Sequence, residues 1–404
     1  MATNFHLFRL FVGYLLLSNV SISQCLNVTC HNQIGSHPFH RMNTCYITRI
    51  DRLLEINEHL TFIQSYGSPD KIKTLDISTP PDDPGIDHVP VEAFHWFPHL
   101  ESLRVNSKLT SITATDLELA ANLTQLMISN QLLLIPVGIF PLNNNLTFLS
   151  FESNRISTID DYAFKGLNHL FSLKLHKNQL ETIKRHTLSG LNVLHVLNLN
   201  ENKIRVIESG AFEDLSELEF LHLQQNRLEI LYDDIFHGLI NLIDISLREN
   251  RITDINESLK NLMSIKNINL DHNHIDNLDL NEFAKFPSLV VLRLINTTFS
   301  FDKTKQSRNE HTPTTSKLQY LDLDKNNLSN PLDLQSLGIF SKLKELSLDN
   351  NLYYNFNWSG EALKMLLPNL KFISLEGNGI DQSVLTSITD EVNTFPTVVY
   401  DDEE

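Results

Sequence analysis

Cysteine is scarce in this 404-residue chain, which holds only Cys25, Cys30 and Cys45. Three cysteines allow at most one internal disulfide, with three alternative pairings, and they leave one thiol over. The sequence leaves open whether that thiol is buried and free or forms an intermolecular disulfide with a partner.

Basic residues are outnumbered, with 32 Lys and Arg against 49 Asp and Glu, which gives a formal net charge of −17. Proteins that bind nucleic acids or anionic membranes generally rely on Lys and Arg to displace counterions. The charge balance therefore argues against both classes of partner and predicts an acidic, self-repelling protein.

Long apolar runs are missing as well. The apolar residues 10–17 follow Arg9 and precede the small residues Ser21 and Ser23, which is the pattern of a signal peptide over residues 1–23. No later stretch reaches the length of a membrane-spanning helix, and the C-terminal residues TFPTVVYDDEE hold no apolar tail for a lipid anchor. We therefore expect a secreted, extracellular protein without a membrane span in the mature chain.

Motifs for catalysis and cofactor binding are also missing. The sequence holds no GxSxG, HExxH or P-loop pattern. His31, His37 and His40 lie close together and His272 and His274 flank an asparagine, but neither spacing matches a zinc motif with cysteine or glutamate partners. We predict a protein that is not an enzyme and that holds no metal or cofactor.

The sequence does contain a repeat, with a period of 24 residues between Leu146 and Leu242. Four units read LTFLSFESN, LFSLKLHKN, LHVLNLNEN and LEFLHLQQN, and a fixed period indicates one supersecondary unit stacked many times. Twelve units are clear, and a thirteenth is indicated near Ile72. Their first apolar residues are Leu100, Leu123, Leu146, Leu170, Leu194, Leu218, Leu242, Ile265, Leu289, Leu318, Leu343 and Leu370.

Each unit predicts one short strand and one polar turn. In LxxLxL the leucines point inward and the residues between them point to solvent, so stacked units form a parallel sheet. The outer wall needs more room per unit than the strand spacing, so the array must curve. The asparagine at position nine is predicted to be structural, because its amide can bond backbone groups where the chain leaves the strand. These asparagines are Asn154, Asn178, Asn202, Asn226, Asn250, Asn273, Asn326, Asn351 and Asn378.

The pattern LxxLxLxxNxLxxIxxxxFxxLxx resembles extracellular leucine-rich repeat proteins of the 24-residue type, such as Toll-like receptor ectodomains and secreted insect immune proteins. The resemblance covers about residues 72–380. It implies an α/β repeat solenoid, a curved horseshoe with a parallel β-sheet on the concave face and irregular turns or short helices on the convex face.

The resemblance also implies capped ends. Residues 24–71 are predicted to be an N-terminal cap, which in this family usually holds four cysteines where this chain has three. Residues 381–404 are predicted to be a C-terminal cap and a short acidic tail. That end has neither a cysteine cap nor a heptad repeat, which puts coiled-coil dimerisation of the kind found in some mosquito immune members in doubt.

For function, the resemblance implies recognition of another protein or of a microbial surface component, with innate immunity as the setting. Two alternatives remain open, a matrix or cell-adhesion protein and an enzyme inhibitor.

The predicted binding face lies on the concave side from about Phe148 to His272, where exposed aromatic and charged residues alternate with the strand leucines. The alternative is an ordinary solvated sheet. The histidines in this face also raise the idea of pH-tuned recognition. The candidate residues are Phe148, Phe171, Lys174, His176, Lys177, Phe220, His222, Arg248 and His272.

Two further features lie outside the repeat pattern. The long interval over 303–316 is polar and locally basic, and it is either a ligand-binding or cleaved loop or a tolerated surface loop. Seven N-x-Ser/Thr sequons predict N-glycosylation. They begin at Asn27, Asn122, Asn145, Asn256, Asn296, Asn327 and Asn357.

Overall fold

The computed structural model describes the backbone of residues 44–47 and residues 72–79, 85–86, 88–89, 92–140, 145–255, 257–275, 278–302, 304 and 316–393. Several predictions lie outside this range. They concern the signal peptide, Cys25, Cys30, Asn27, Asn256, most of the 303–316 interval and residues 394–404.

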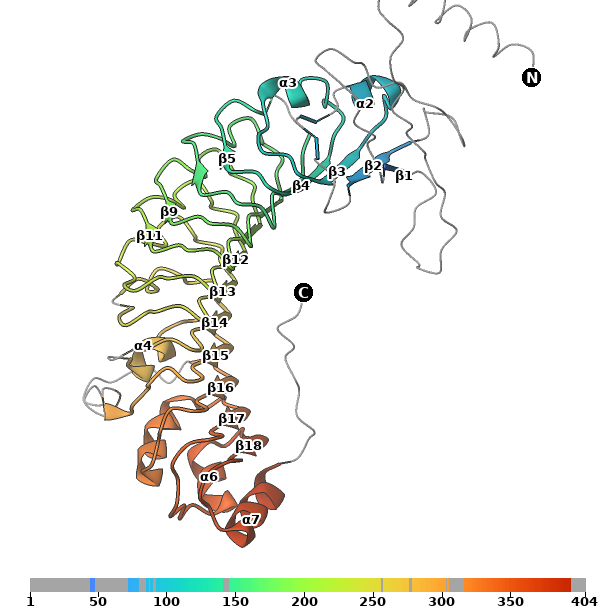
Figure 1. Ribbon diagram of the computed structural model, residues 1–404. Helices are drawn as coiled ribbons and strands as arrows, with labels where there is room; N and C mark the ends of the chain where they lie inside the picture. The colour runs from blue at the N-terminus through green and yellow to red at the C-terminus, as the bar shows by residue number, and fades with distance from the viewer. Residues whose placement is uncertain are drawn as a thin grey trace, which may run out of the picture.

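The chain forms one large parallel sheet of 14 strands along the concave side of a curved solenoid (Figure 1). This confirms the predicted fold class. In sheet order the strands are β1 (Thr44–Ile47), β2 (Thr74–Ser78), β3 (Ser102–Ser107), β4 (Gln125–Asn130), β6 (Phe148–Ser150), β8 (Ser172–Lys174), β10 (Val196–Asn198), β12 (Phe220–His222), β13 (Asp244–Ser246), β14 (Asn267–Asn269), β15 (Val291–Arg293), β16 (Tyr320–Asp322), β17 (Glu345–Ser347) and β18 (Phe372–Ser374).

The strands pair so that residues at the same place in each unit are neighbours. Leu197 in β10 pairs with Leu173 on one side and with Leu221 on the other, and all three side chains are fully buried. Because each unit adds the same leucines at the same phase, the core is one continuous apolar column.

The convex side holds short helices, as expected, and two small sheets that the sequence pattern did not reveal (Figure 1). Each small sheet pairs two strands of two residues, which is too short for an alternation to be recognised in the sequence. The helices are α2 (Glu92–Trp96), α3 (Ala114–Leu117), α4 (Leu280–Ala284), the 3₁₀ helix η3 (Pro331–Ile339), α6 (Gly360–Leu366) and α7 (Gln382–Val392), and the short strands are β5 (Leu134–Ile135), β7 (Thr158–Ile159), β9 (Thr182–Ile183) and β11 (Val206–Ile207).

Phenylalanines fill the outer part of the core. Phe212 and Phe236 stack with ring centroids 6.3 Å apart, and both are buried. Phe140 and Phe164 repeat the same contact at 6.3 Å. Bulky rings on the convex side and leucines on the sheet side keep the two walls apart, which maintains the curvature.

At the C-terminal end, α7 lies against α6 and β18 and buries Ile388 and Val392. Asn393, directly after α7, accepts a hydrogen bond from the Ile373 N–H at 2.9 Å and donates one to the Ile373 carbonyl at 3.2 Å. Its side-chain amide thus pairs with the backbone of β18 as a further strand would, which satisfies part of that exposed sheet edge.

At the other end, β1 pairs with β2 in register, with Cys45 opposite Leu75. The sheet therefore begins inside the segment predicted as the N-terminal cap.

Candidate functional site

The asparagines at position nine form a buried hydrogen-bonded column. Asn202 donates from Nδ2 to the carbonyls of Leu199 and Leu175, both at 3.0 Å, and accepts from the Leu180 N–H at 3.1 Å. One amide thus connects two successive units, and equivalent contacts recur at the other eight predicted positions. Asn378, in the last unit, is half-buried and the other eight are buried.

One unit has Thr297 in place of the asparagine. Its hydroxyl donates to the Leu294 carbonyl at 3.0 Å, and its backbone carbonyl accepts from the Ile275 N–H at 3.0 Å. The column therefore continues through this unit, with a backbone group supplying part of what the amide supplies elsewhere.

Position eight, just before the asparagine, takes a left-handed backbone conformation in unit after unit. Lys177 has φ 56°, Gln225 55° and His272 55°, whereas glycine occupies this place only at Gly377, with φ 68°. The repeat pattern did not predict this conformation, because most of these residues are not the types that favour it. Lys177 and His272 therefore lie in turns after the strands and not on the sheet itself.

The structure divides the predicted binding face into strand and turn positions. Phe148, Lys174, Phe220 and His222 lie in the strands β6, β8 and β12, and Phe171 directly precedes β8. The other four predicted residues, His176, Lys177, Arg248 and His272, lie in the turns that follow the strands.

Two of the cations at the turn positions of the predicted binding face form ion pairs within the chain. Lys177 Nζ lies 3.7 Å from a Glu201 carboxylate oxygen, and an Arg248 guanidinium nitrogen lies 2.8 Å from a Glu249 carboxylate oxygen. Lys177 and Glu201 are 24 residues apart, so the period of the repeat is what brings them together. These two side chains have less charge available for a partner than the sequence suggested.

The three histidines of the face are partly covered, which corrects the expectation that they are exposed. Burial lowers the pKa of His176, His222 and His272, with opposing effects from nearby carboxylates such as Glu152 near His176. Side chains of neighbouring units cover them, because successive strands lie only about 4.8 Å apart. Lower pKa values keep these histidines mostly neutral at neutral pH.

The aromatic residues of the face remain accessible. Phe171 is 50% exposed and stacks on His195 with ring centroids 4.4 Å apart, and Phe220 is 38% exposed. Lys174 Nζ lies 5.5 Å from the centroid of the half-buried Phe148 ring. Exposed rings beside a cation are a common composition of protein-binding surfaces.

The last units carry an acidic column at position seven, the residue after the last strand leucine. Asp324 Oδ1 accepts from the Asp349 N–H and the Ser347 hydroxyl, both at 2.7 Å. Burial and the neighbouring Asp322 raise the pKa of Asp324 to about 7. These carboxylates bond the backbone between units, so they have a structural task in addition to their charge.

The five predicted sequon asparagines in the described ranges are all exposed. Asn122 and Asn145 each precede the first leucine of a unit, and their Nδ2 atoms donate to the carbonyls of Pro98 and Ala121 at 3.0 and 2.9 Å. Asn296 and Asn327 have φ values of 51° and 58° in the turns after β15 and β16. The remaining sequon, at Asn357, precedes α6.

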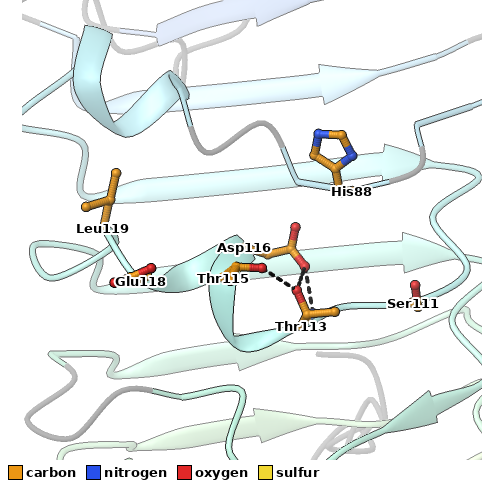
Figure 2. A pocket seen from close by; sticks show the side chains of 7 residues that line it. All are labelled: His88, Ser111, Thr113, Thr115, Asp116, Glu118 and Leu119. Atoms are coloured by element: carbon orange, nitrogen blue, oxygen red, sulfur yellow. Dashed lines mark hydrogen bonds between the residues drawn. The ribbon is translucent and has the colours of Figure 1, made fainter. Parts of the chain in front are cut away.

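A pocket of about 390 Å³ lies beside α3, lined by hydroxyl groups, His88 and Asp116 (Figure 2). Asp116 accepts from the N–H groups of Val89 and Thr113 at 3.1 and 2.6 Å and from the Thr113 hydroxyl at 2.7 Å. Its carboxylate is therefore engaged in holding the start of α3 against the preceding unit.

Within the described ranges no cluster of His, Cys, Asp or Glu has the arrangement of a metal site. None of the helices described has the length and apolar character that crossing a bilayer requires.

Two models of known protein families match the repeat region of the chain. A model described as "Leucine rich repeat" matches residues 172–228 and 221–275, and one described as "BspA type Leucine rich repeat region (6 copies)" matches residues 71–194. Together they cover about half of the chain. No curated protein matches the chain.

Solved structures share the fold at low sequence identity. A chain of the Toll–Spatzle complex of Drosophila is 20% identical, with a TM-score of 0.59, over 76% of this chain and 40% of its own. An internalin (inlF) of Listeria monocytogenes is 22% identical, with a TM-score of 0.56, over 82% of this chain and 88% of its own.

A chain of the TLR13–ssRNA13 complex is 22% identical, with a TM-score of 0.54, over 78% of this chain and 52% of its own. This chain thus spans about half the length of that receptor chain and less of the Toll–Spatzle one. The repeated strand, the asparagine column and both family models agree, and the chain is a leucine-rich repeat protein whose fold resembles Toll-like receptor ectodomains.

Proposed function

We propose that this chain is a secreted, non-enzymatic recognition protein that binds another protein through the concave face of its solenoid, between Phe148 and His272. The observation that carries the proposal is the exposure of Phe171 and Phe220 on that face, in the units of β8 and β12 with one unit between them. A folded protein gains by burying such rings, and partners tend to anchor on them.

The charge of the chain supports a protein partner over a nucleic acid. The net charge of −17 repels a phosphate backbone, and Lys177 and Arg248 already pair with carboxylates of the same chain. The TLR13 structure contains single-stranded RNA and the Toll structure contains Spatzle. Between these two kinds of ligand, the charge balance favours a protein for this chain, and the likeness to receptor ectodomains suggests innate immunity as the setting.

The proposed domain division keeps residues 72–380 as the repeat array, with residues 24–71 and 381–404 as its caps. The contacts of α7 and Asn393 with the last unit support the C-terminal boundary. Signal cleavage after residue 23, glycosylation and a disulfide through Cys25, Cys30 or Cys45 belong to the same proposal.

Affinity purification with the tagged full chain from the secreted fraction tests the proposal. We expect one or a few proteins to be captured by the wild type and lost with the double variant Phe148→Ser/Phe220→Ser. The convex variant Tyr232→Ser is a matched control, because Tyr232 is 63% exposed on the opposite side. Capture that survives every substitution on the concave face would contradict the proposal. Elution with and without reductant shows whether a cysteine holds the partner.

A further inference from the structure

Apolar residues at or just before the start of four neighbouring strands form one patch, in which Phe171, Val193 and Phe220 are exposed and Phe148 and Val196 are half-buried. We call the aromatic patch the set Phe148, Phe171, Val193, Val196 and Phe220, which belong to the successive units of β6, β8, β10 and β12. Phe171 is 50% exposed, and Phe220 and Val193 are each 38% exposed. Single exposed apolar residues are normal on a soluble protein, but a run across four neighbouring units marks an interaction surface.

The patch has definite limits along the sheet. Phe148, Ser172, Val196 and Phe220 occupy the same register position in four adjacent strands. The next strand, β13, has Asp244 at this position. Two phenyl rings thus lie about 14 Å apart, at three strand spacings, with two smaller side chains between them. That span suits a short peptide segment laid across the strands.

One cation borders the patch without an ion-pair partner. Lys174 lies in β8, with Nζ 5.5 Å from the Phe148 ring centroid, and no carboxylate of the described residues forms an ion pair with it. His222 occupies the same strand position two units further on, but burial lowers its pKa, so it adds little charge at neutral pH. The patch therefore offers apolar surface together with one available ammonium group.

We propose that the aromatic patch docks an acidic segment of a partner protein. One or two aliphatic or aromatic side chains of that segment cover Phe171 and Phe220, and an Asp or Glu carboxylate pairs with Lys174. The inference rests on the proposed function and adds the chemistry of the partner. Charges elsewhere on the acidic chain are screened beyond about 8 to 10 Å in physiological salt. The Asp244 carboxylate lies three strands from Lys174 and already accepts from Asn267 Nδ2 at 2.7 Å. At this place the Lys174 ammonium therefore selects an acidic segment, because a basic one meets it as a like charge.

Synthetic peptides test the charge preference directly. Three labelled dodecapeptides share two Phe and two Leu anchors and differ only in carrying Glu, Gln or Lys at the remaining positions. Fluorescence anisotropy with the full chain should show the Glu peptide binding about tenfold or more tightly than the Lys peptide. Lys174→Glu should reverse that order, and Phe171→Ser should weaken every peptide by about tenfold.

Tyr354→Ser is the control, because Tyr354 is 65% exposed on another part of the chain and should leave all three affinities unchanged. Circular dichroism and urea midpoints confirm that the surface variants are folded. Equal binding of the three peptides, or a Lys174→Glu variant that keeps the original order, would overturn the inference. If a purified partner is lost with Phe148→Ser/Phe220→Ser while the Glu peptide fails to bind, the inference is wrong and the proposed function stands.

Discussion

The unit of β10, one of the middle units (β8–β14), and the units of β17 and β18, two of the last units (β16–β18), share one backbone. They satisfy the N–H of the residue after the last strand leucine differently. In the unit of β10 the N–H of Asn200 donates to Asn198 Oδ1 of the same unit, at 3.1 Å. In the last units the N–H of Asp349 donates to Asp324 of the preceding unit, at 2.7 Å. The hydrogen bond from Asp349 to Asp324 connects two units. It also requires a carboxylate in a partly buried place, where burial raises the pKa of Asp324 to about 7.

The two regions also respond to pH in opposite directions. In the middle units, burial lowers the pKa of His176 and His222, so the unfolded chain binds more protons and acidification through about pH 6.5 destabilises these units. In the last units the raised pKa of Asp324 means that the folded chain binds more protons. Their stability therefore falls as pH rises from about 4 to about 7. The stabilities of the two regions can depend on pH in opposite ways because each unit of a solenoid contacts mainly its neighbours.

The largest expected effect comes from breaking the asparagine column in a middle unit. Asn226→Ala removes hydrogen bonds to the Leu199 and Leu223 carbonyls and from the Ile204 N–H, all in a buried site. We expect a loss of roughly 3 kcal/mol in the free energy of unfolding, measured by urea denaturation. The exposed Glu229→Ala serves as a control with little change.

The corresponding substitution at Thr297, in the unit before β16, should lower the free energy of unfolding by less. Thr297→Val keeps the side-chain volume and removes a hydroxyl that donates to the Leu294 carbonyl or to Asn326 Oδ1, while the backbone bond from Ile275 remains. We expect a loss of about 1 kcal/mol. A loss equal to that of Asn226→Ala would show that the threonine unit depends on its side chain as fully as an asparagine unit does.

A smaller difference concerns position eight. Ser153 has φ 56° and Gly377 has φ 68°. Ser153→Gly should stabilise the unit of β6 by about 0.5 to 1 kcal/mol, because glycine adopts a left-handed conformation without strain. Gly377→Ala should destabilise by about 1 to 2 kcal/mol, and its methyl group would lie 2.4 Å from Asn350 Oδ1. Equal small changes of the same sign in both variants would contradict this account.

The smallest expected effect is the local response to pH. Hydrogen exchange at pH 5.5 and 7.5, corrected for intrinsic rates, should show protection falling in β8–β12 and rising in β16–β18 on acidification. Asp324→Asn should reduce the rise in β16–β18 and leave β8–β12 unchanged. Asparagine does not titrate in this range, whereas Asp322 and Glu345, whose pKa values burial also raises, remain. A uniform change along the whole sheet would mean that the units do not titrate locally.

The sequence predicted the sheet, its register and the places of the position-nine asparagines, because all three follow from one period. It did not predict the left-handed residues, since Lys177 and Gln225 carry no composition signal for that conformation. Position eight is left-handed even before Thr297, where Asn296 has φ 51°, so the turn out of the strand requires the conformation with or without the asparagine. The Lys177–Glu201 ion pair could have been predicted from the 24-residue period. The burial of His222 could not, because it depends on how side chains of neighbouring units pack.

Because all strands share one register, equivalent residues on the concave face are separated by whole strand spacings. A deletion of one unit, residues 194–217, would join two ends of the same phase and let Asn226 bond the preceding unit as Asn202 does now. The distance between Phe148 and Phe220 would then shorten by one strand spacing, about 4.8 Å. The separation of binding residues on this face can therefore change only in whole steps.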